Sequence, residues 1–235
     1  MVHLEDVPSL DVLLVFQIGT QRKEHQVSVR ASSGRSPGDD YDLQNPVGSF
    51  VEVVRRVVMQ PVGFFSSIPR RGNLLSPLVF ALICLEISTI LGGILRLAWS
   101  SQASGVRFQG EEYGFGDFIA SVIFAPIGGA IGLFILAGIA HLLVMLFVGA
   151  GNSGFESTFR VVSYVSVTNL VNWIPVIGGL IALYGLYLAI VGVREMHATT
   201  TGRASLVVLV PFAVILFLVL LILLVAGAFL LGRFA

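Results

Sequence analysis

Apolar residues gather in long windows from residue 74 onward, while polar residues crowd the first 46 positions. A helix needs about 20 consecutive apolar residues to cross a hydrocarbon core of about 30 Å. Windows of this kind predict transmembrane helices at residues 74–99, 118–148, 155–173, 176–193 and 205–231. We therefore expect an all-α integral membrane protein, built as a bundle of five transmembrane helices.

The second window is the longest, and Pro126 could divide it into two short passes. The placement of arginine favours a single long or kinked helix, because cytoplasmic loops carry an excess of basic residues. With five spans, one side of the membrane holds Arg55, Arg56, Arg70, Arg71, Arg160, Arg194 and Arg203. We expect that side to be the cytosol, with the N-terminus there, the C-terminus opposite, and the cell (plasma) membrane as the location.

An apolar stripe precedes the first window. The stripe repeats at helical spacing through Phe50, Val53, Val54, Val57 and Val58. It predicts an N-terminal amphipathic helix that ends before Pro61. This helix lies either in the headgroup region, as an interfacial helix, or packed on the protein's own core.

The polar stretch before this helix predicts a second kind of segment. Residues 1–46 have low hydrophobicity and many loop-forming residues, which is typical of a mostly disordered cytosolic head. Residues 47–235 then form the membrane domain.

Composition narrows the functional classes. The chain is 55% hydrophobic and 12% charged with zero formal net charge, whereas soluble domains are about 25% charged. Its mean hydropathy is +0.90. Zero net charge argues against nucleic-acid binding. The single cysteine, Cys84, supports neither a disulfide framework nor a cysteine metal site. No nucleophile, base and orienting residue gather on a predicted loop, so we expect no enzyme activity, no cofactor and no metal.

A polar turn, "GNSGFESTFR", separates the second and third windows. Ser153 and Glu156 have the spacing of a capping box, in which each side chain bonds the backbone amide of the other. Arg160, one turn beyond Glu156, is placed to pair with it. A phosphate-binding loop of the Walker type is excluded because no lysine follows the glycines. Contact of the helix N-terminus with a lipid phosphate or a partner is the alternative.

The third window is unusually polar, and two other windows carry an ionisable residue. The intramembrane candidates are Glu86, His141, Tyr164 and Asn169. Polar side chains in hydrocarbon either bond neighbouring helices or line a wet cavity. Glu86, near the middle of the first window, is a functional residue or a protonated side chain bonded to a Ser or Asn. For His141 we consider Tyr164, Asn169 or Glu86 as partners.

Several segments resemble the Yip domain (Ypt-interacting protein) family. They are "QPVGFFSSIPRRGNLLSPLVFALI", "HLLVMLFVGAGNSG", "FESTFRVVSYVSV" and "NWIPVIGGLIALYGLYLAIVGVREMH". The resemblance covers about residues 47–231 and rests on order and spacing. Its positions include Pro61, Phe65, Phe155, Tyr164, Pro175, Gly178 and Gly192. It implies a five-span membrane protein with a cytosolic N-terminus.

Eukaryotic members of that family engage Rab-type GTPases and one another in vesicle traffic. Two departures argue against transferring GTPase binding: Asp42-Leu43-Gln44-Asn45-Pro46 replaces Asp-Leu-Tyr-Gly-Pro, and Thr168 stands where many relatives carry proline. The chain is more similar to the prokaryotic branch. We expect a non-enzymatic scaffold or adaptor in membrane organisation, with the bilayer, a second copy or other membrane proteins as partners. The alternative is a small-solute or ion permease using a polar site around Glu86.

Overall fold

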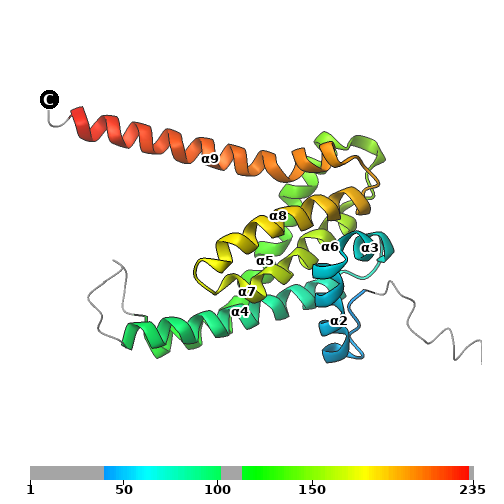
Figure 1. The fold of residues 1–235 in the computed structure, drawn as a ribbon, viewed down its shortest axis with the longest axis horizontal. Coiled ribbons are helices and arrows are strands. Elements are labelled where there is room, and N and C mark those ends of the chain that lie inside the picture. The colour runs from blue at the N-terminus through cyan, green and yellow to red at the C-terminus, as the bar shows by residue number, and fades with distance from the viewer. Residues whose placement is uncertain (1–39, 102–112, 233–235) are drawn as a thin grey trace, which may run out of the picture. The chain divides into compact units, whose positions relative to one another are not determined.

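The computed structural model of the chain describes residues 40–101 and 113–232, which form helices joined by turns and contain no strand (Figure 1). The helices are α2 (Pro46–Met59), α3 (Pro61–Ser67), α4 (Leu75–Ser101), α5 (Phe115–Phe147), α6 (Phe155–Val165), α7 (Asn169–Asn172), α8 (Ile177–Met196) and α9 (Thr201–Gly232). Two short 3-10 helices, η1 (Gly149–Gly151) and η2 (Ser166–Thr168), flank α6. The predicted all-α fold is confirmed for the described residues.

Four helices of the described residues are long and apolar enough to cross a membrane. They cover Leu75–Ala98, Phe115–Phe147, Ile177–Met196 and Thr201–Leu224. Most of their surface faces outward, which suits lipid rather than water. The second of them is one helix of 33 residues with Pro126 inside it, as the arginine distribution predicts. The chain is therefore a membrane protein by the length and composition of its helices.

The third predicted window, residues 155–173, is not one long helix. It consists of α6, η2 and α7, none of which is long enough to cross a membrane alone. At η2 the hydroxyl of Thr168 donates to the carbonyl of Val165 at 2.9 Å, and that of Ser166 to the carbonyl of Val162 at 3.2 Å. Such side-chain bonds to the backbone compete with regular helix geometry. The described residues thus supply one fewer long span than the sequence predicts.

An aromatic core joins α2 and α3 to the spanning helices. The ring of Tyr164 lies 4.9 Å from that of Phe64 and 5.2 Å from that of Phe80. The inward face of α2, with Val53 and Val57, is buried in the same core. The predicted amphipathic stripe therefore packs on the protein's own core, which is one of the two positions expected for it.

The corner between α2 and α3 lies beside α8 rather than beyond its end. The hydroxyl of Tyr184 donates to the carbonyl of Val58 at 2.5 Å. Tyr184 lies 12 residues before Met196, the last residue of α8. At a rise of 1.5 Å per residue this is about 18 Å along the helix. In Figure 1, α2 runs across the direction of α4 and α8.

The compact unit begins at Asp40, before the predicted boundary at residue 47. Tyr41 is buried, and its backbone N–H donates to the hydroxyl of Tyr164 at 3.1 Å. Asp40 forms an ion pair with Arg160. Residues 40–46 therefore belong to the packed domain and not to the predicted polar head. The rest of that head, residues 1–39, lies outside the described residues.

Gly178, in the first turn of α8, gives a prediction with a matched control. A Cβ at Gly178 would lie 2.6 Å from the carbonyl oxygen of Asn172, whereas a Cβ at Gly179 would meet nothing within 4 Å. We expect Gly178→Ala to destabilise the protein by about 1–3 kcal/mol, because backbone must move. Gly179→Ala should change stability by less than about 1 kcal/mol. Thermal unfolding in detergent measures both, and equal effects would contradict the close approach.

Candidate functional site

A hydrogen-bonded group of two histidines and a threonine joins α5, α6 and the segment between α8 and α9. We call His141, Thr158 and His197 the His–Thr–His cluster. Nδ1 of His141 lies 2.9 Å from the hydroxyl oxygen of Thr158, and that oxygen lies 3.1 Å from Nε2 of His197. The backbone N–H of Ser153 donates to Nδ1 of His197 at 3.1 Å. The cluster thus fastens the turn after α5 to the end of α8.

The direction of these bonds fixes the protonation of His197. The amide of Ser153 can only donate, so Nδ1 of His197 accepts and the ring proton is on Nε2. Nε2–H then donates to Thr158, whose own proton is free to bond Nδ1 of His141. The pKa of His197 is lowered to about 4, chiefly by burial and also by the nearby His141 and Arg70. The cluster holds a neutral His197 at neutral pH.

A second group fastens the segment before α2 to α6. The guanidinium of Arg160, only 1% exposed, pairs with Asp40 and donates from Nη2 to the carbonyl of Asn73 at 2.8 Å. Burial raises the pKa of Asp40 to about 7. The backbone N–H of Tyr41, which donates to Oδ1 of Asp40 at 3.1 Å, opposes that rise because it favours the ionised carboxylate. Together with the bond between Tyr41 and Tyr164, this pair holds the segment before α2 against the aromatic core.

The predicted capping box at Ser153 and Glu156 is wrong. The N-cap of α6 is Gly154, with a φ of 93° and no side-chain capping bond. That left-handed residue starts the helix at Phe155, so Glu156 takes the second helical position instead of the third that a capping box needs. Its carboxylate instead accepts from the backbone N–H of Gly72 at 2.7 Å.

The predicted pairing of Arg160 with Glu156 is also wrong, because each side chain bonds a residue that is distant in the sequence. Arg160 is directed to Asp40, across the interface between α6 and the segment before α2. The turn is therefore held by tertiary contacts. Its local motif does not determine its bonds.

The intramembrane candidates do not share one hydrogen-bonded site in the described residues. His141 bonds Thr158 and not Tyr164, Asn169 or Glu86, the partners that we considered for it. Tyr164 accepts from Tyr41, 123 positions away in the sequence. Both carboxyl oxygens of Glu86 are buried without a hydrogen-bond partner, so the expected bond to a Ser or Asn is not formed.

The remaining predicted positions have structural surroundings. Asn169 begins α7 and Pro61 begins α3. Phe155 begins α6, and Pro175 lies in the turn before α8. Close packing explains why position 192 is a glycine, because a Cβ at Gly192 would approach Val161 at 2.7 Å and the ring of Phe65 at 3.2 Å.

Sequence reasoning missed Asp40, Tyr41, Thr158 and His197. None belongs to a local motif, and Thr158 and His197 meet across 39 positions. The glycine at position 154 was the one available signal that the helix starts later than a Ser153 cap requires. In the described part of the chain, no three His, Cys, Asp or Glu side chains gather closely enough to hold a metal ion.

Comparison with known proteins identifies the family. Neither the curated proteins nor the solved structures contain a match to this chain. Residues 55–224 match the family described as the Yip1 domain. Because this match covers well over half of the sequence, the chain belongs to the Yip1 domain family.

Proposed function

We propose that this membrane protein is a non-enzymatic scaffold or adaptor that presents the surface of α2 and α3 at the cytosolic face of the cell membrane. The observation that carries the proposal is that polar bonds fasten α2 and the segment before it to α8 and α6. Tyr184 holds the end of α2, and the Asp40–Arg160 pair holds the segment before it. A fixed surface of this kind suits binding to a partner, because little ordering is needed on contact.

The outward face of α2 supports its placement at the membrane interface. Val47, Val51 and Met59 are 77%, 63% and 74% exposed, and Arg55 is exposed beside them. Apolar residues mixed with arginine on an exposed helix face are typical of a helix lying at the boundary between headgroups and acyl chains. The opposite face of the same helix packs on the core.

The connections support a fifth crossing made of short pieces. Both Ser153, before α6, and Thr158, within it, bond His197 at the end of α8. The start of α6 and the end of α8 therefore lie at the same end of the bundle. Since α8 is 20 residues long, the chain must run to its far end through α6, η2 and α7 before α8 begins. We propose that these pieces form the third of five crossings.

Photo-cross-linking in cells tests the scaffold proposal. A photoreactive residue at exposed Val51 should give discrete adducts with a membrane protein or a second copy, identified by mass spectrometry. The same residue at buried Val53 should give only intramolecular products, because that face packs on the core. Absence of any protein adduct at Val51 and at Met59 would remove the support for a scaffold.

A permease is the second candidate function, and Glu86 is the observation that favours it. An ionisable residue inside a spanning helix is expected to be functional. A water-filled path would let a small hydrophilic thiol reagent label Glu86→Cys in a Cys84→Ala background. Labelling there would favour the permease, and protection from the reagent would favour the scaffold.

Glu86 also gives a prediction on stability. Its carboxyl oxygens are buried without partners, which carries an uncompensated desolvation penalty. We expect Glu86→Leu to stabilise the protein by about 1–3 kcal/mol. Glu86→Gln, which keeps the polar group, should gain less. Thermal unfolding in detergent measures both changes, and a loss of stability in Glu86→Leu would show that the carboxyl group has a partner in the folded protein.

A further inference from the structure

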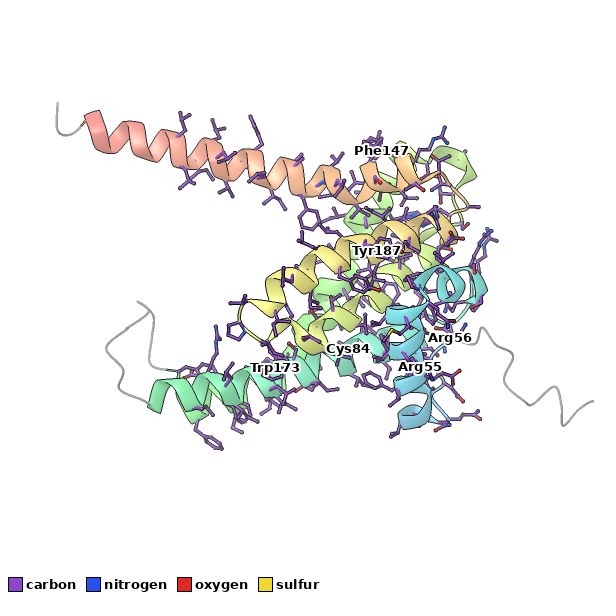
Figure 2. All side chains as sticks on the ribbon, viewed as in Figure 1. Arg55, Arg56, Cys84, Phe147, Trp173 and Tyr187 are labelled. Carbon is purple, nitrogen blue, oxygen red and sulfur yellow. The ribbon has the colours of Figure 1, made fainter. Side chains whose placement is uncertain are left out.

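We infer that exposed arginines on α2, after α3 and at the start of α9 bind anionic phospholipid headgroups. The inference rests on the proposed placement of α2 and α3 at the membrane interface, and it names the ligand of that surface. The exposed residues are Arg55 on α2, Arg70 and Arg71 after α3, and Arg203 on α9. Figure 2 shows Arg55 and Arg56 on α2, and Trp173 toward the other end of the bundle.

Two hydrogen bonds bring the segment after α3 and the start of α9 to the same end of the bundle. Nη2 of Arg70 donates to the carbonyl of Glu195 at 3.2 Å, in the last turn of α8. Arg194, beside Glu195, donates from Nη1 to the hydroxyl of Thr201 at 3.5 Å, at the start of α9. The segment after α3 therefore lies beside the junction of two spanning helices, at the depth where headgroups meet the ends of such helices.

Three acidic side chains near these arginines have other partners. Asp40 pairs with Arg160, and an oxygen of Glu195 lies 2.6 Å from Nη2 of Arg194. Glu156 accepts from the amide of Gly72. By contrast, Arg55, Arg71 and Arg203 form no ion pair within the described residues. Their charge is available to an external anion.

The neighbouring apolar surface favours lipid over an acidic protein as that anion. Val47, Val51 and Met59 are exposed on α2 at helical spacing from Arg55, and Val62 is exposed on α3. Acyl chains cover such side chains while phosphates meet the guanidinium groups, whose planar donors bind phosphate in pairs. An anionic leaflet attracts basic residues at its surface. A single phospholipid can therefore contact both the arginines, through its phosphate, and the exposed valines, through its acyl chains.

The opposite end of the bundle provides a matched control. There the guanidinium of Arg96 lies 5.5 Å from the ring centre of Tyr113, two residues before α5. Asp117 in the same region accepts from the amide of Gly114 at 2.8 Å. The described residues at that end therefore offer an arginine of the same type without the group of exposed arginines.

Electron spin resonance of spin-labelled lipids tests the inference on the full chain in phosphatidylcholine vesicles. Spin-labelled phosphatidylglycerol should associate roughly threefold or more strongly than spin-labelled phosphatidylcholine. The preference should fall in 1 M salt, where the Debye length drops to about 3 Å. A variant with Arg55→Gln, Arg71→Gln and Arg203→Gln should lose most of it, while Arg96→Gln should keep it. An unchanged preference in the triple variant would overturn the inference.

A second measurement separates this inference from the proposed function. A spin label on Val51→Cys, in a Cys84→Ser background, should be more accessible to oxygen than to a water-soluble nickel chelate. If the label is accessible to oxygen but the wild type shows no preference for phosphatidylglycerol, the interfacial placement of α2 stands and the lipid inference fails. A label exposed to the chelate would overturn the interfacial placement, and the inference with it.

Discussion

Asp40→Ala is expected to destabilise the folded protein by about 3–5 kcal/mol, because it leaves a buried guanidinium without its acid. Arg160 is 1% exposed, and its remaining bond, from Nη2 to the carbonyl of Asn73, does not neutralise its charge. The change should also release the segment that carries Tyr41 from the aromatic core. Unfolding in detergent at pH 8, above the pKa of about 7 that burial gives Asp40, measures the loss.

Two further variants make this prediction specific. Asp42→Ala, two positions away, removes only a carboxylate that bonds the exposed amide of Gln44, and it should change stability by less than about 1 kcal/mol. Replacing both charges, with Asp40→Ala and Arg160→Met, should recover most of the loss because no unpaired charge stays buried. Equal effects of the two aspartate variants would show that the ion pair does not hold the segment.

The sequence predicts the spanning helices well because their signal is local. Length and hydropathy of a window are enough to place α4, α5, α8 and α9. The arginine distribution correctly predicts that α5 is one helix despite Pro126. The window at 155–173 is harder, since its apolar and polar residues are mixed and the break at η2 depends on which hydroxyls turn back to the backbone.

The bonds of the candidate site could not be predicted because their partners are distant in the sequence. Glu156 and Gly72 are 84 positions apart, and Tyr41 and Tyr164 are 123 apart. A capping box describes only what neighbours can offer, and the tertiary fold gave Glu156 a different donor. The predicted polar character of the third window was informative, since Thr158 bonds the spanning helix α5 through His141. The residues that bond to Thr158 could not be predicted from the sequence.

Lowering the pH from 7 to 4 is expected to remove about 3 kcal/mol of stability through His197. Its pKa falls from 6.5 to about 4 on folding, chiefly through burial, with His141 and Arg70 adding to the effect. Between these values the unfolded chain binds the proton and the folded protein does not, so stability falls as pH falls. Below about pH 4 both states are protonated and the loss ends. Thermal unfolding in detergent at several pH values measures the profile.

The geometry explains why the folded protein resists this proton. A charged His197 would carry N–H groups on both nitrogens, and the one at Nδ1 would face the N–H of Ser153. Asp40 acts with the opposite sign, because its raised pKa makes the folded state bind a proton first as pH falls. The His197 contribution is therefore the difference between the profiles of the wild type and His197→Gln. The variant should have the flatter fall below pH 6.5, and parallel profiles would show that His197 titrates as an exposed histidine, without the bond to Ser153.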